Sequence, residues 1–288
     1  MTFRADIRCV DCFDKGLWSF VERGGLDEQR SREVFERARN MVLPRLKSYP
    51  PPIAGATAYV FLRETFQGRD IFARDKRIFT SSLLEELPRI SANLRKHSAP
   101  ESEALKASAW GNMLDVGQGK PLPDLQELTE LLYRPMRMDD VRSFLEKLSG
   151  ASTLLILGDN AGETVLDRLF LEIARPRADV YYTVRPQPVM NDATGKDARH
   201  ASLHRFSTLV NTGLDAPTVH PDLVDDKLRN LFKSADLILS KGQGNLEGLM
   251  GIRDPRLYFS FVVKCPLMSE VTGFPEGQAV FASSMELG

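Results

Sequence analysis

The chain has 288 residues, of which 42% are hydrophobic and 27% charged, and its 38 lysines and arginines nearly balance 39 aspartates and glutamates. A net charge of -1 argues against a nucleic-acid or membrane-surface partner, because such proteins usually carry a basic excess. No apolar run approaches the roughly 20 residues that a membrane-spanning helix needs, and three cysteines predict a reducing, cytoplasmic setting rather than a disulfide framework.

The first 150 residues predict a mostly helical portion. Over residues 27–46, apolar side chains recur at helical spacing and charged side chains occupy the opposite face. Three prolines at positions 50–52 then interrupt the chain. Further helices are expected over residues 53–66, 71–95 (interrupted near Pro88), 125–133 and 139–148. We therefore expect an α-helical N-terminal portion over residues 1–150.

After residue 150, short apolar runs alternate with helical segments. The runs predict strands over residues 154–157, 180–184, 207–210, 237–239 and 257–263, and helices are expected between them, at 164–174 and 221–233 among others. Strands separated by helices imply βαβ units and a parallel sheet. The sequence thus predicts an α/β fold over residues 151–288, with a doubly wound, Rossmann-like, mostly parallel sheet that carries a metal- and phosphate-binding site.

Polar and small residues follow four of the predicted strands. Asp159 and Asn160 end the first strand, Asn191 and Asp192 follow the second, and Asn211 to Gly213 follow the third. The fourth is followed by Lys241 and a glycine-rich stretch. Ligands of open α/β sheets bind beyond the carboxyl ends of the strands, and hard divalent metals favour oxygen ligands. Helix capping at Asp159-Asn160 and a turn at residues 191–194 are the simpler structural alternatives.

The glycine-rich stretch SKGQGNLE can bind an anion through its backbone, with Lys241 adding a positive charge. It lacks the order of a Walker loop, and no GxGxxG follows the first strand, which argues against a dinucleotide cofactor.

Three motifs, LGDNAGE (157–163), RPQPVMNDAT (185–194) and SKGQGNLE (240–247), resemble in order and spacing the damage-control phosphatases. This is the ARMT1-like family, formerly a domain of unknown function numbered 89. CVDCFDK (9–15) and WGNMLDVG (110–117) extend the resemblance into the N-terminal half. The pair Cys9 and Cys12 makes the chain similar to the branch of this family that is common in archaea and anaerobic bacteria.

The resemblance implies a divalent-metal-dependent phosphatase that hydrolyses small phosphorylated metabolites such as sugar phosphates, in metabolite damage control. It implies that Asp159, Asn160 and Asp192 hold the metal (manganese, magnesium, cobalt or nickel) and that Lys241 holds the substrate phosphate. Asp159, Lys241 and Glu163 are the implied catalytic residues. The remaining implied substrate contacts are Gly242, Gly244, Asn245, Arg185, Asn112 and Asn191. Asp159 can act as a ligand only or also as a nucleophile.

Several questions stay open at the level of sequence. Cys9 and Cys12 have the spacing of a second metal site or a redox pair, or they are simply two reduced thiols. Asp115, three residues after Asn112, either reaches the site or is solvated. A SAM-dependent carboxyl methyltransferase and a non-catalytic phosphometabolite-binding protein are the alternative functions. The sequence does not decide between a monomer and a homo-oligomer.

Overall fold

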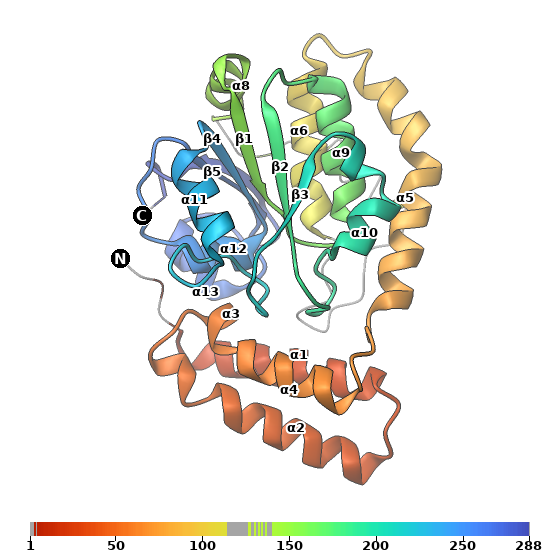
Figure 1. The fold of residues 1–288 in the computed structure, drawn as a ribbon, viewed down its shortest axis with the longest axis vertical. Helices are drawn as coiled ribbons and strands as arrows, with labels where there is room; N and C mark the ends of the chain where they lie inside the picture. Colours follow the sequence, from red (N-terminus) through yellow and green to blue (C-terminus); the bar gives the residue numbers. More distant parts are fainter. Residues whose placement is uncertain are drawn as a thin grey trace.

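The structure, a computed structural model, describes residues 3, 5–113, 126, 127, 130, 132, 134, 136 and 140–287. The described residues before the sheet are mostly helical, as predicted (Figure 1). The helix expected over residues 125–133 lies largely outside the described residues. Its elements are α1 (Ile7–Arg23), α2 (Glu28–Val42), η1 (Arg45–Lys47), α3 (Pro51–Ala54), α4 (Ala56–Thr65), α5 (Ala73–Leu94), α6 (Pro100–Trp110), η2 (Gly111–Met113) and α8 (Val141–Gly150). None of the described helices is both long enough and apolar enough to span a bilayer.

A six-stranded sheet with the order β3-β2-β1-β4-β5-β6 forms the centre of the molecule. Its first five strands are parallel and β6 pairs with β5 in the antiparallel sense. The fold is therefore the predicted α/β, doubly wound, mostly parallel sheet. Its strands are β1 (Thr153–Leu157), β2 (Asp179–Val184), β3 (Thr208–Asn211), β4 (Leu237–Lys241), β5 (Leu257–Val262) and β6 (Ala279–Ser283). The helices and 3-10 turn between them are α9 (Glu163–Ala174), α10 (Gly195–His200), η3 (Leu203–Arg205), α11 (Asp226–Ser234), α12 (Gln243–Leu249) and α13 (Pro266–Thr272).

Helices cover both faces of the sheet. Since successive side chains of a strand point to opposite faces, neighbouring residues of one strand belong to different hydrophobic clusters. In β1, Leu154 and Ile156 belong to the hydrophobic cluster formed with α5, α6, α8 and α9. Leu155 and Leu157 belong to the cluster formed with α11, α12 and α13. All four side chains are at most 1% exposed, which explains why this strand is an uninterrupted apolar run.

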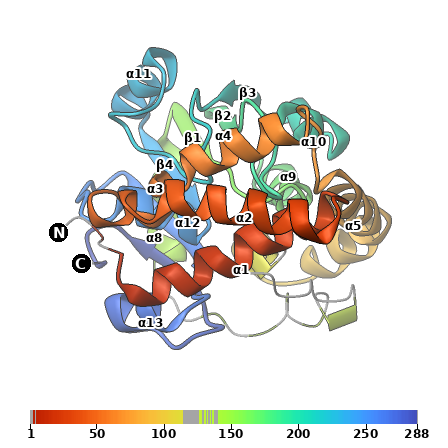
Figure 2. The ribbon, with the colours of Figure 1, turned by 90° about the horizontal axis from the view of Figure 1, so that it is seen from below.

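The N-terminal helices have two different positions. Helices α5, α6 and α8 cover one face of the sheet, with α6 and α5 against α9. Helices α1, α2 and α4 lie instead across the edge where the parallel strands end (Figure 2); we call α1–α4 the cap. Each hydrophobic cluster contains residues from before and after position 150. The proposed division at residue 150 stays a prediction.

Several elements differ from the sequence prediction. Helices α1 and α6 and strand β6 were not expected, although the Asp6 side chain caps α1 by accepting from the Arg8 amide, 2.8 Å away. Pro88 does not interrupt α5, which continues through it. Helix α5 buries Leu83, Leu87 and other apolar residues on one side, and this packing outweighs the hydrogen bond that a proline removes.

Candidate active site

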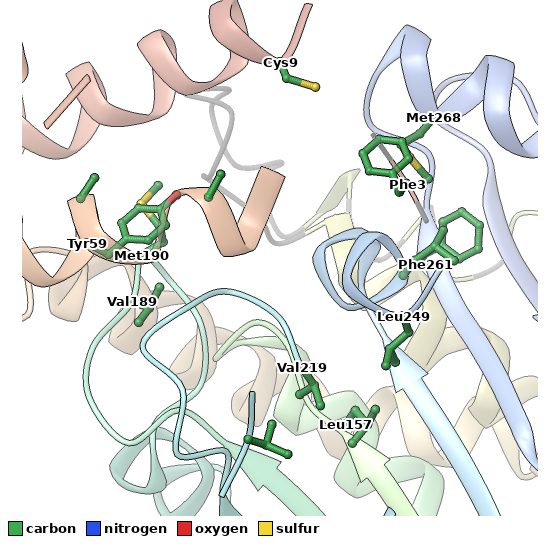
Figure 3. Close-up of a cluster of buried hydrophobic side chains, with 14 of the residues drawn as sticks. Phe3, Cys9, Tyr59, Leu157, Val189, Met190, Val219, Leu249, Phe261 and Met268 are labelled. Atoms are coloured by element: carbon green, nitrogen blue, oxygen red, sulfur yellow. The ribbon is translucent and has the colours of Figure 1, made fainter. Parts of the chain in front are cut away.

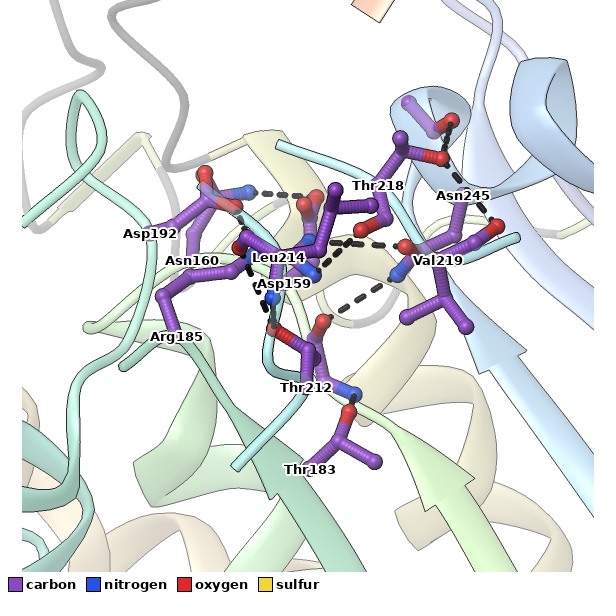
Figure 4. A network of polar contacts seen from close by, with 12 residues as sticks. Asp159, Asn160, Thr183, Arg185, Asp192, Thr212, Leu214, Thr218, Val219 and Asn245 are labelled. Atoms are coloured by element: carbon purple, nitrogen blue, oxygen red, sulfur yellow. Dashed lines mark hydrogen bonds and ion pairs between the residues drawn. The ribbon is translucent and has the colours of Figure 1, made fainter. Parts of the chain in front are cut away.

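The predicted site residues meet at the carboxyl edge of the sheet, where the strand order reverses between β1 and β4. Asp159 and Asn160 follow β1, and Asn191 and Asp192 lie in the loop between β2 and α10. An isolated antiparallel bridge pairs Asn160 with Asp192. Figure 4 shows Asp159, Asn160 and Asp192 side by side in one polar network. The structure therefore brings the three predicted metal ligands together.

Backbone and side-chain bonds fix these two loops against each other. The Ala193 amide donates to the Asp159 carbonyl at 2.8 Å, and the Ala161 amide donates to the Asn191 carbonyl at 2.9 Å. Nδ2 of Asn191 donates to Oδ1 of Asn160 at 2.9 Å. The predicted turn-and-cap role of residues 191–194 also exists, because Thr194 and Asp197 form a capping box for α10. The loop thus caps a helix and supplies site residues at once.

Arg185, at the end of β2, holds Asp192 rather than facing the solvent. Its Nε donates to Oδ2 of Asp192 at 2.6 Å, and it donates further to the Thr218 carbonyl at 2.8 Å and to Oδ1 of Asn245 at 3.4 Å. The side chains of Arg185 and Asp192 are 2% and 5% exposed. Nδ2 of Asn245 donates to the Gly158 and Lys241 carbonyls. Asn245 thereby ties the ends of β1 and β4 together.

The N-terminal half contributes Asn112, which lies in η2. Its Nδ2 donates to Oδ2 of Asp159 at 2.7 Å and to Oε2 of Glu163 at 3.3 Å. Its Oδ1 accepts from the Val262 amide of β5 at 3.1 Å. The side chain is fully buried, so all three bonds are shielded from water. Asp115, which the sequence placed three residues further on, lies outside the described residues.

Lys241 is fully buried and does not line the cavity that Asp159 and Asp192 line. Its Nζ lies 2.5 Å from Oε1 of Glu163 and 2.6 Å from Oδ1 of Asp167, and it donates to Oγ of Ser108 at 2.8 Å. Burial alone would lower the pKa of Lys241, but Asp167 and Glu163 outweigh it and raise that pKa. Burial raises the pKa of Glu163, a shift that Lys241 opposes and that Asp167 and Asp159 increase. The predicted contact of Lys241 with phosphate stays a prediction.

Asp167, Ser108 and Tyr182 are site residues that the sequence did not reveal. Asp167 follows Glu163 by four residues in α9, so both face the same side of that helix. This spacing was the available signal for Asp167. Ser108 comes from α6 and Tyr182 from β2, and neither position carries a local pattern that points to the site.

Gly242 allows Asp159 and the start of α12 to approach closely. Its φ of 81° is in the left-handed region, and a Cβ at this position would lie 1.9 Å from Oδ2 of Asp159. The glycine is therefore required by both conformation and space. Its amide donates to the Ser260 carbonyl at 2.8 Å. The sheet thus already uses the N–H that was expected to face phosphate.

A cavity of about 440 Å³ opens between the sheet edge and the cap. Asp159, Asn191, Asp192 and Gly244 line it from the sheet. Among the described residues, its lining does not include Asn160, Glu163, Asn112, Arg185, Lys241, Gly242 or Asn245. The cap lines it with polar and apolar side chains, including Cys9, Cys12, Phe13, Pro51, Pro52 and Tyr59. Figure 3 shows Tyr59 of the cap beside Met190, which precedes Asn191.

All three cysteines line this cavity, with Cys265 at the start of α13 joining Cys9 and Cys12 of α1. None of these three described cysteines is joined to another by a disulfide bond. Within the described part of the chain, no three histidine, cysteine, aspartate or glutamate side chains are grouped so that they could hold a metal ion. A second metal at Cys9 and Cys12 stays a prediction that this arrangement does not strengthen.

The charge of the site favours a cation. Four buried carboxylates, from Asp159, Glu163, Asp167 and Asp192, face two buried cations, Lys241 and Arg185. With all six ionised, the site has a formal excess of two negative charges. Buried charge is costly unless it is compensated. A divalent cation bound by the carboxylates of Asp159 and Asp192 and the amide of Asn160 would supply that compensation, and oxygen ligands suit such an ion.

The chain is similar in sequence and in fold to known proteins. A damage-control phosphatase of Pyrococcus horikoshii is 30% identical over 283 residues, which cover 96% of this chain and 97% of the relative. A damage-control phosphatase of Archaeoglobus fulgidus is 31% identical over 188 residues, which cover 63% of this chain and 64% of the relative. A crystal structure of a DUF89 family protein from Pyrococcus horikoshii has a TM-score of 0.86 and 27% identity, and the match covers 98% of this chain and 99% of that one.

The family described as "Damage-control phosphatase ARMT1-like domain" matches residues 5–280. That range contains all three motifs of the sheet edge, as well as the cap, α6 and η2. This chain therefore belongs to the damage-control phosphatase ARMT1-like family.

Proposed function

We propose that this protein is a divalent-metal-dependent phosphatase that hydrolyses small phosphorylated metabolites. The observation that carries the proposal is the placement of Asp159 and Asp192 in the lining of a 440 Å³ cavity. Behind this lining, the buried charge favours a divalent cation. The volume is within the range of about 300–1,000 Å³ that is usual for small-ligand sites. The names of the Pyrococcus and Archaeoglobus relatives support the same class of reaction.

In this proposal Asp159, Asn160 and Asp192 hold the metal. A bound divalent metal lowers the pKa of a coordinated water and offsets charge on the phosphoryl group during transfer. The protein's own contribution is to orient these ligands. Arg185 fixes the carboxylate of Asp192, and Asn112 fixes that of Asp159. Rigid, buried ligands need little reorganisation during the reaction, and this lowers its barrier.

The cap has the complementary role of enclosing the substrate. Its side chains line the cavity opposite Asp159 and Asp192, so a bound metabolite is covered on the side that faces away from the sheet. Enclosure removes bulk water from the reacting phosphate, and electrostatic interactions are stronger where water is excluded. The substrate class proposed from the family resemblance is a small phosphate ester such as a sugar phosphate.

Phosphate release from a panel of sugar phosphates tests the proposal. Metal-stripped protein receives magnesium, manganese, cobalt or nickel singly, and Asp159→Ala is compared with Asp222→Ala, whose side chain is 88% exposed. We expect release that depends on metal, is lost in Asp159→Ala and is unchanged in Asp222→Ala. Equal activity of Asp159→Ala and the wild type would refute the ligand assignment. If the protein binds a sugar phosphate tightly but releases no phosphate with any of the four metals, the result would favour a non-catalytic binding protein over a phosphatase.

A further inference from the structure

A continuous chain of buried polar groups extends from the proposed metal ligands into the interior of the protein. Nδ2 of Asn160 lies 3.5 Å from Oε2 of Glu163, which also accepts from Asn112 at 3.3 Å. The other oxygen of Glu163 contacts Lys241, and Lys241 contacts Asp167. Asp167 is in turn bound by Tyr182, whose hydroxyl donates to its Oδ2 at 2.7 Å.

Lys241 has no donor left for a substrate in this arrangement. An ammonium has three N–H donors, and four protein oxygens surround this one. They are Oε1 of Glu163, Oδ1 of Asp167, and the Oγ and carbonyl oxygens of Ser108, between 2.5 and 3.2 Å away. The side chain is also completely buried. To bind phosphate directly, it would have to leave two carboxylates without their counter-ion.

Asp167 is held from three sides. Ser108 donates to its Oδ1 at 2.5 Å, Lys241 lies against the same oxygen, and Tyr182 occupies Oδ2. Asp167 is 1% exposed. These partners leave its carboxylate one orientation, and that orientation fixes the ammonium of Lys241 against Glu163.

We infer that Asp167 and Lys241 are positioning residues, which act through Glu163 on the side-chain amides of Asn112 and Asn160. The inference rests on the proposed phosphatase function and assigns Lys241 to the support of the metal ligands instead of to the substrate phosphate. Oε2 of Glu163 accepts hydrogen bonds from the side-chain amides of Asn112 and Asn160. The position of the Glu163 carboxylate therefore determines the orientation of both amides. The Asn112 amide in turn holds Asp159. Outer-shell partners of this kind typically affect metal affinity or activity by about 10- to 100-fold.

The test compares Asp167→Asn and Lys241→Met with the wild type and with Asp254→Asn, an ion-paired aspartate far from the site in the loop before β5. Three quantities are measured: kcat and KM for a cleaved sugar phosphate, the inhibition constant of inorganic phosphate, and the affinity for Mn²⁺ without substrate. We expect the two site variants to lose about 10- to 100-fold in kcat or in Mn²⁺ affinity. We expect less than about a threefold change in phosphate inhibition, and no change in any quantity for Asp254→Asn.

Opposite outcomes overturn the inference. If Lys241 binds phosphate, Lys241→Met weakens phosphate inhibition and raises KM at least tenfold while Mn²⁺ affinity stays as in the wild type. If a variant does not fold, as judged by circular dichroism, Tyr182→Phe takes its place. It removes one bond to Asp167 and should give a smaller loss of the same kind.

Crystal structures of the wild type and of Asp167→Asn separate this inference from the proposed function. Displacement of the Glu163 carboxylate away from Asn112 and Asn160 supports positioning even if no metal yields phosphate release. If the side chains of Glu163, Asn112 and Asn160 have the same positions in both crystal structures, the positioning inference is refuted, whatever the activity of the variant. A wild-type enzyme that releases no phosphate contradicts the proposed function alone.

Discussion

Replacing Gly242 with alanine tests whether the approach of α12 to Asp159 shapes the site. Gly242 has φ 81° and ψ 154°, a conformation that is essentially restricted to glycine and costs another residue about 1–3 kcal/mol. The added Cβ would also lie 1.9 Å from Oδ2 of Asp159, so the carboxylate must move, and crowding of a packed interior typically costs about 1–3 kcal/mol. We therefore expect a total loss of about 2–6 kcal/mol in the free energy of unfolding.

Gly273 provides a control that has a positive φ but no steric contact. Its φ of 75° is also left-handed, but a Cβ there has nothing within 4 Å. Gly273→Ala should therefore show the backbone cost alone, about 1–2 kcal/mol. The difference between the two variants then combines the contact with Asp159 and the additional backbone cost of Gly242, whose ψ is 154° against 4° at Gly273.

Urea unfolding gives both free energies, and metal-dependent phosphate release gives the effect on the site. Gly242→Ala should lose about 100-fold in kcat, since a displacement of about 1 Å in an active site can have that effect, whereas Gly273→Ala should keep wild-type turnover. Equal destabilisation of the two variants would refute the steric argument. Full activity of Gly242→Ala would show that the place of the Asp159 carboxylate does not depend on this contact.

Three further predictions concern other parts of the molecule. The Arg256 guanidinium holds the pKa of Asp254 below its usual range, so Asp254→Asn should cost about 1 kcal/mol in urea unfolding at pH 7. This cost should disappear in acid, below the lowered pKa, where the wild-type carboxyl is protonated too, and a loss that persists there contradicts the pairing. Burial raises the pKa of the Cys9 thiol to about 11; its alkylation by iodoacetamide, followed by peptide mass mapping, should be slow at pH 8 and rise steeply toward pH 11, and a fast rate that does not vary with pH refutes this. Phe144 is fully buried, with three aromatic ring centroids 5.3 to 6.5 Å from its own, so Phe144→Ala should cost about 3–5 kcal/mol in the same unfolding assay, and a loss under about 1 kcal/mol would contradict that packing.

The sheet and its edge were predictable because their signals are local. An apolar run followed by Gly158, Asp159 and Asn160 indicates a buried strand that ends in polar side chains. Apolar runs also precede Asp192, which follows β2 after a short loop, and Lys241, which is the last residue of β4. Since parallel strands end at one edge, these residues could be brought together without knowledge of the strand order. Helix α1 also has a local signal, because Asp6 is a favourable N-cap residue just before it.

The partners of the site residues could not be predicted, because they come from distant parts of the chain. Asn112 is 47 positions from Asp159, and Lys241 is 74 positions from Asp167. No periodicity or spacing in the sequence relates such pairs. The resemblance to the family implied a lysine near the phosphate, but the identity of its neighbours depends on how α6 and α9 pack together. Burial determines which groups surround Lys241, since a fully buried ammonium needs counter-ions, here the carboxylates of Glu163 and Asp167.

The cavity has a floor and a roof of separate origin. The floor consists of short loops fixed by the sheet, and the roof comes from the cap helices near the N-terminus. Substitutions at Phe13 or Pro51 can therefore reshape the cavity without replacing the proposed metal ligands Asp159, Asn160 and Asp192. Such a division lets one reaction be retained while the accepted metabolite changes. It makes the cap the place to begin when engineering a new substrate preference into this scaffold.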